Sequence, residues 1–177
     1  MKLRRPISIL FALGISVAAG QLSAQTAGAQ PSTSAIPEKV PFDTPYGVSL
    51  GVGDAMRAID AARSEAATHG WPEAIAVTDI SGGLVAFFKM DGAQNSSAEI
   101  AQRKASVSAR YRRETRVFYN AMEGSHAYVA TLEPGVVAAP GGYPLIVGGK
   151  VVGAIGCSGG TGDQDATVCA AGARVVR

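Results

Sequence analysis

Two pairs of short apolar runs, each joined by a glycine-rich turn, constrain the fold of this chain more than any other feature. They are 74–80 and 84–90 around residues 81–83, and 144–147 and 150–157 around residues 148–149. Apolar runs separated by such turns are typical of antiparallel β-hairpins. With a further short edge strand expected at 136–138, the pattern predicts a mainly antiparallel, five-stranded sheet.

Helical periodicity surrounds these hairpins. Apolar or small residues recur with a spacing of three or four between 52 and 66, and Gly70 follows as a stop signal. Further helices are expected at 97–112, at 115–122 and from Asp163 to the C-terminus. Because the hairpins are not separated by βαβ crossovers, the sequence predicts an α+β domain with helices flanking the sheet.

The first 29 residues have the three parts of a secretory signal peptide. A basic start is followed by an apolar run over 7–19 and by small residues, with Ala27-Gly28-Ala29 as the expected cleavage site and 22–24 as an alternative. The apolar run is too short for a membrane-spanning helix, which needs about 20 residues. We therefore expect a periplasmic or secreted protein with no membrane span after cleavage.

A Pro- and Ser-rich segment, residues 30–46, follows the signal and is expected to form a disordered or extended arm. The remaining domain, 47–177, is long enough to bury one core. The net charge of the whole chain is +2. The signal contributes +3 of this, so the protein after cleavage carries −1.

A basic cluster remains on the second predicted helix and just after it: Arg103, Lys104, Arg110, Arg112, Arg113 and Arg116. Few aromatic residues are interleaved with these positions, and an exported protein meets little nucleic acid. We interpret the cluster as a solvated helix face and expect no nucleic-acid partner.

The two cysteines, Cys157 and Cys169, leave two alternatives open. Export permits a disulfide between them, whereas two small buried side chains are the other interpretation. Their spacing fits no zinc motif.

No recognisable catalytic constellation is present. Ser158 does not lie in a nucleophile elbow, the glycine-rich stretch at 156–162 lacks the Lys-Ser/Thr pair of a P-loop, and the aspartates lack EF-hand spacing. Asp79 is better explained as a turn residue and Asp163 as a helix cap. Binding is therefore favoured over catalysis. The side-chain types that can ligate a haem iron occur at His126, Met90, Tyr111, Tyr119, Tyr128 and Tyr143.

Several motifs in order resemble the GlcG/HbpS-like family, also called the haem-degrading domain family, over about residues 49–177. They are AVTDISGGLVAF at 76–87, MDGA at 90–93, KA at 104–105, Thr115, PGGYPL at 140–145, VGAIGCSGG at 152–160 and QD at 164–165. The resemblance implies a profilin-like α-β-α fold and assembly into homo-oligomers, from dimers to octamers. It also implies that secreted members bind haem, some as accessory sensors of haem or redox stress.

The resemblance further implies a site. It associates Thr115 with the haem iron and places Asp91, Lys104 and Gly141-Gly142 in a pocket, to which we add Met90, Ser158 and His126 as candidates. We expect the proline–glycine corner, the Ser158 loop and the Lys104 helix to wall a shared cavity. Two alternatives stay open: an enzyme or accessory subunit acting on a small organic acid or corrinoid, which needs Lys104, Asp79 or Asp91 in one cleft, and an oligomeric scaffold.

Overall fold

A computed structural model describes residues 42–177. The expected signal peptide and residues 30–41 of the expected arm lie outside the described residues. Residues 42–46 are extended along the domain, where Tyr46 forms an isolated bridge to Val151 and its hydroxyl donates to the Arg110 carbonyl over 2.7 Å. Among residues 42–177, no helix combines the length and apolar character that crossing a bilayer requires.

The sheet has four strands in the order β2-β1-β4-β3, and every neighbouring pair is antiparallel. Both predicted hairpins form. Their strands are β1 (Ala74–Thr78), β2 (Leu84–Lys89), β3 (Gly142–Val147) and β4 (Lys150–Ser158). The turn between β1 and β2 is held by Asp79, whose Oδ1 accepts hydrogen bonds from the amides of Ser81 and Gly83. These bonds lower the pKa of Asp79.

The expected fifth strand at 136–138 does not form. Val136 and Ala138 instead pack on a small apolar cluster of Val107, Phe118 and Val129. The prediction of five strands was therefore wrong for this segment, because its partly buried apolar side chains pack on this cluster without joining a strand ladder.

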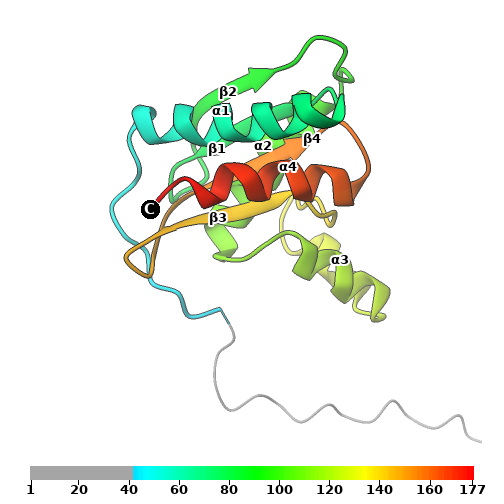
Figure 1. Cartoon of the computed structure of the whole chain (residues 1–177). Helices are drawn as coiled ribbons and strands as arrows, with labels where there is room; N and C mark the ends of the chain where they lie inside the picture. The colour runs from blue at the N-terminus through cyan, green and yellow to red at the C-terminus, as the bar shows by residue number, and fades with distance from the viewer. Residues whose placement is uncertain (1–41) are drawn as a thin grey trace, which may run out of the picture. The chain divides into compact units, whose positions relative to one another are not determined.

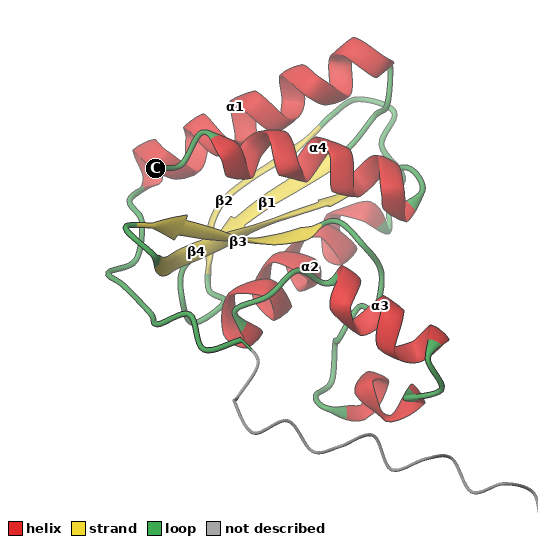
Figure 2. Cartoon of the chain, turned by 60° about the horizontal axis from the view of Figure 1, so that its bottom comes forward, coloured by secondary structure: helices red, strands yellow, loops and turns green. Residues whose placement is uncertain are grey.

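Helices cover both faces of the sheet (Figures 1 and 2). On one face, α1 (Val52–His69) lies beside α4 (Gly162–Arg174), and on the other face lies α2 (Ser97–Tyr111). Small residues allow α2 to approach closely. A Cβ atom at Gly156 of β4 would overlap the backbone of Ala101 and Ala105.

Beyond the sheet, α3 (Arg116–Glu123) and the short 3₁₀ helix η1 (Ala127–Thr131) project from the C-terminal end of α2 (Figure 2). The last helix, α4, begins earlier than expected. Its cap is Thr161, which forms a reciprocal capping box with Gln164, so the cap role expected of Asp163 was wrong.

A disulfide joins Cys157 of β4 to Cys169 of α4, with the two Cα atoms 5.6 Å apart. Both residues are fully buried. Of the two alternatives that the sequence left open, the structure therefore shows the disulfide. It links the sheet covalently to α4.

Candidate functional site

An ion pair lies in the interior of the domain. The Nζ of Lys104 on α2 is 2.6 Å from Oδ2 of Asp165 on α4 and also donates to the Cys157 carbonyl over 3.0 Å. The side chains of Lys104 and Asp165 are 2% and 4% exposed. Because the lysine is buried and paired, its assignment to a solvated helix face was wrong.

The other oxygen of Asp165 organises the loop that precedes α4. Its Oδ1 accepts hydrogen bonds from the amides of Gly159 and Gly160, at 3.1 and 3.0 Å. A carboxylate at the start of a helix also interacts favourably with the helix dipole. The loop after β4 is therefore held by one buried side chain.

The Gly141-Gly142 corner packs directly against this pair. Gly141 has a φ of +114°, and a Cβ there would lie 2.7 Å from the Cβ of Asp165 and 3.0 Å from Nζ of Lys104. A Cβ at Gly142 would lie 2.6 Å from both the Lys104 carbonyl and the Thr115 Cγ2. The corner thus requires glycine for space and, at Gly141, for conformation.

Thr115 forms two hydrogen bonds with the segment that contains the Gly141-Gly142 corner. Its hydroxyl donates to the Ala139 carbonyl over 2.6 Å and accepts from the Gly142 amide over 2.9 Å. The residue is fully buried. With its hydroxyl donating one hydrogen bond and accepting another, Thr115 positions the start of α3, and no free hydroxyl faces a ligand.

The structure divides the predicted site residues into three groups. Lys104, Thr115, Gly141, Gly142 and the buried Ser158 at the end of β4 belong to the packed interior. Met90 and the exposed Asp91 lie just after β2. His126 is exposed before η1, with its ring edge-to-face on Tyr128 at 6.1 Å. The proline–glycine corner, the Ser158 loop and the Lys104 helix lie together, as expected. At their junction, however, the residues are buried and pack closely against one another.

The enzyme alternative required Lys104, Asp79 or Asp91 in one cleft. Lys104 is buried in its ion pair, whereas Asp79 and Asp91 lie at opposite ends of β2. Asp79 accepts hydrogen bonds within its own turn. The arrangement that this alternative requires is therefore absent from these three residues.

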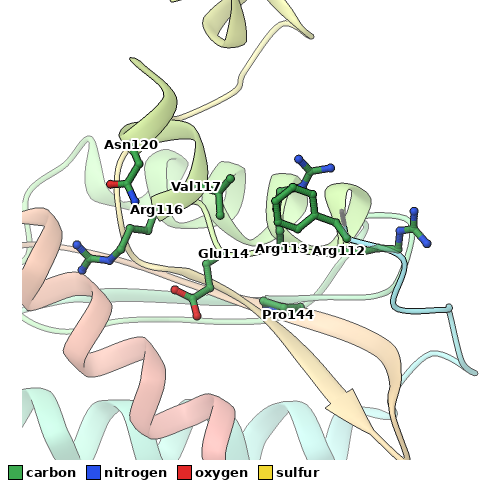
Figure 3. A pocket seen from close by; sticks show the side chains of 8 residues that line it. Arg112, Arg113, Glu114, Arg116, Val117, Asn120 and Pro144 are labelled. Carbon is green, nitrogen blue, oxygen red and sulfur yellow. The ribbon is translucent and has the colours of Figure 1, made fainter. Parts of the chain in front are cut away.

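An open hollow of about 450 Å³ lies at the junction of α2 and α3. We call it the arginine groove. Figure 3 shows Arg116 on one side of Val117 and Glu114, and Arg112 and Arg113 on the other. The residues that line the arginine groove are Phe42, Arg112, Arg113, Glu114, Arg116, Val117, Asn120 and Pro144.

Two of these arginines are half-buried and make no ion pair within residues 42–177. Arg112 donates to the Thr44 carbonyl over 3.1 Å. The Arg113 guanidinium lies 3.7 Å from the centre of the Phe42 ring. Burial and repulsion from Arg112 lower the pKa of Arg113, and an arginine so placed still carries its charge. The groove thus presents positive charge that an anion can neutralise.

A second hollow, of about 290 Å³, lies next to the groove and shares Arg116 with it. Tyr119 and Pro140 line it, and Arg116 forms an ion pair of 2.7 Å with Asp163 at its rim. Tyr119 is 41% exposed. A phenol oxygen is therefore available beside the arginine groove.

Comparisons with known proteins agree with this architecture. The family described as "Haem degrading protein HbpS-like" matches residues 50–174. Protein GlcG of Escherichia coli K12 is 38% identical over 100 residues, which cover 56% of this chain and 74% of GlcG.

Two solved structures share the fold. A double mutant of Streptomyces reticuli HbpS aligns with a TM-score of 0.69 and 26% identity over 83% of this chain and 99% of that one. A PduOC:heme complex aligns with a TM-score of 0.68 and 24% identity over 73% of this chain and 96% of that one. The chain belongs to this HbpS-like family.

Proposed function

We propose that this protein binds haem in the arginine groove. The observation that carries the proposal is the pair of half-buried guanidiniums, Arg112 and Arg113, without a carboxylate partner among the described residues. Membership of a family named for haem supports the choice of ligand. The PduOC:heme complex supports it further, because it has the same fold.

The residues of the groove fit the chemistry of haem. Haem is a flat apolar macrocycle that carries two propionates at one edge. Val117, Pro144 and Phe42 supply apolar surface, and Arg112 and Arg113 supply donors suited to carboxylates. The volume of about 450 Å³ lies within the range of small-molecule sites.

Tyr119 is the side chain that we propose as the iron ligand. Proximal haem ligands are usually His, Cys, Met or Tyr. Among the described residues lining the groove and the hollow beside it, Tyr119 alone is of these types. Thr115 is a poor choice because its hydroxyl bonds Ala139 and Gly142. His126 lines neither hollow.

The same groove also suits a second candidate, a small organic acid. A pair of guanidiniums can hold any carboxylate, and this feature alone does not select the macrocycle. A competition experiment distinguishes the two ligands. If the groove binds small organic acids, millimolar glycolate should displace hemin. If the groove is specific for haem, glycolate should leave hemin bound.

We also propose export to the periplasm or outside the cell, as the N-terminal pattern predicts, and assembly into homo-oligomers of two to eight copies. An accessory role in sensing haem or redox stress would follow from haem binding. Light scattering of the purified protein tests the assembly, and fractionation of expressing cells tests the export.

The experiment for haem binding is a hemin titration of the purified protein, followed by its Soret absorption. The Arg112→Ala/Arg113→Ala variant should bind at least about tenfold more weakly, since charge-assisted hydrogen bonds contribute about 1.5–3 kcal/mol each. The matched control is Arg57→Ala/Arg103→Ala, which removes two exposed arginines outside the groove. Equal affinities of the two variants, or no saturable binding by the unmodified protein, would contradict the proposal.

A further inference from the structure

Glu73 is a buried acid whose carboxylate lacks a hydrogen-bond donor within residues 42–177. It precedes β1, is 0% exposed, and neither of its carboxyl oxygens has a hydrogen-bond partner among the described residues. Burying an isolated ionised carboxylate is costly, and such a group takes up a proton instead. The unpartnered oxygens therefore indicate a carboxyl group that is protonated in the folded state.

The group that faces Glu73 is the carboxylate of Asp165. Two ionised carboxylates repel each other, and neither can donate a hydrogen bond to the other. One proton changes this, because a protonated Glu73 donates to Asp165. Asp165 already receives Lys104 on Oδ2 and two amides on Oδ1, so it is the member stabilised as the anion.

The charges of the cluster balance when the two carboxyl groups hold one proton. Lys104 contributes one positive charge and Asp165 one negative charge, so a neutral Glu73 leaves the buried cluster without net charge. Burial, and then repulsion by Asp165, raise the pKa of Glu73 from 4.5 to about 8, against a lowering effect of Lys104. The titratable residues nearest to Glu73 along the chain are His69, exposed at the end of α1, and Asp79, partly exposed in the turn after β1.

Glu73 also lies where several loops meet. Its carbonyl accepts from the Met90 amide over 2.8 Å, and a Cβ at Gly159 would lie 2.9 Å from the Glu73 Cα. The Gly159 carbonyl accepts from Gln94 over 3.2 Å. A negative charge at Glu73 would repel Asp165, which holds the Gly159–Gly160 loop through two amide hydrogen bonds.

We propose that Glu73 and Asp165 hold one proton between them in the folded domain, and that loss of this proton in mild alkali loosens the loop at Gly159–Gly160. The carboxyl pair is separate from the proposed haem site, since neither Glu73 nor Asp165 lines the arginine groove. It makes the fold itself sensitive to pH.

The sign of the effect follows from proton linkage. In the unfolded chain Glu73 is ionised above its ordinary pKa of 4.5, whereas the folded domain keeps the proton up to about pH 8. The folded state binds more protons in this window, so the folding constant falls about tenfold per pH unit between these values. Above pH 8 the loss levels off.

Glu73→Gln removes the ionisable group while keeping its size. Unfolding in urea between pH 5 and 9 should show a flatter stability profile for this variant than for the unmodified protein, and greater stability near pH 8. Glu99→Gln, at an exposed glutamate of α2, is the control and should keep the original profile. Parallel profiles for all three proteins would overturn the proposal.

A second measurement avoids any dependence on the variant folding. The carboxyl carbon of Glu73 in the unmodified protein, followed by ¹³C NMR, should titrate near pH 8, and the Gly159 and Gly160 amides should exchange faster above that pH after correction for intrinsic rates. Titration of Glu73 between pH 4 and 5, or amide protection that does not change, would overturn it.

Discussion

Lys104 and Asp165 form an ion pair that joins the helices covering opposite faces of the sheet. The pair spans 2.6 Å between Nζ and Oδ2, at the point where β4 ends and the glycine corner turns. Because neither charge is accessible to water, this contact differs from the exposed pairs on α1 and α2. The pair therefore places two opposite charges in the interior of the domain.

Removal of the lysine charge should be strongly destabilising. Lys104→Met leaves the Asp165 carboxylate buried without its cation, which typically costs about 3–5 kcal/mol. Urea unfolding at pH 7 measures this loss. Lys150→Met, at an exposed position of the β3–β4 hairpin, should change the stability by less than about 0.5 kcal/mol. A loss below about 1 kcal/mol for Lys104→Met would show that the buried pair contributes little.

The disulfide should contribute substantially to stability. It closes a loop with a sequence separation of 12, for which the chain-entropy relation gives about 3 kcal/mol. We expect Cys157→Ala/Cys169→Ala to unfold at lower temperature by calorimetry under oxidising conditions. Thiol titration of the denatured, unreduced protein should detect no free cysteine, and two free thiols would contradict the cross-link.

Thr115 should matter for stability through its hydroxyl. Thr115→Val keeps the shape but leaves the partly buried Ala139 carbonyl and the buried Gly142 amide without their partner, at a cost of about 1–3 kcal/mol. Thr115→Ser keeps the hydroxyl and should retain more of the stability than the valine variant. Chemical unfolding measures the stability of both variants. Equal losses of stability would show that the hydrogen bonds of Thr115 do not stabilise the fold.

Close packing of β4 on α2 predicts a contrast between two glycines. Gly156→Ala places a methyl group on the backbone of Ala101 and Ala105, and overpacking of this kind costs about 1–3 kcal/mol or more. Gly53→Ala, on the open face of α1, meets no atom within 4 Å and should be neutral or stabilising by about 1 kcal/mol. Thermal unfolding of both variants tests this, and similar melting temperatures would be inconsistent with the packing.

The fold could be predicted largely from local patterns. The turns at 81–83 and 148–149 define two hairpins whatever the rest of the chain does, and the α1 periodicity marks a buried face. The segment 136–138 shows the limit of this method. Its apolar residues look like a strand, but whether they pair or pack on Val107 and Phe118 depends on long-range contacts.

The candidate site was harder to predict than the fold. Lys104 lies three residues after Ala101 and four before Ser108, on the small-residue face of α2 that packs on the sheet. This register was the signal for its burial, but the neighbouring arginines favoured a solvated face. Glu73 gave no signal, since no pattern marks a lone acid that tertiary packing buries. The groove, likewise, depends on Phe42 reaching Arg113 from far along the chain.

The most direct test of haem binding is to map the bound iron by NMR. Ferric haem broadens the signals of nearby amides, so titration of ¹⁵N-labelled protein with hemin reports where the ligand lies. We predict selective broadening at residues 112–120 and around Pro144. Broadening confined to the Met90–Asp91 loop or to α1, with the signals of residues 112–120 unchanged, would contradict the account.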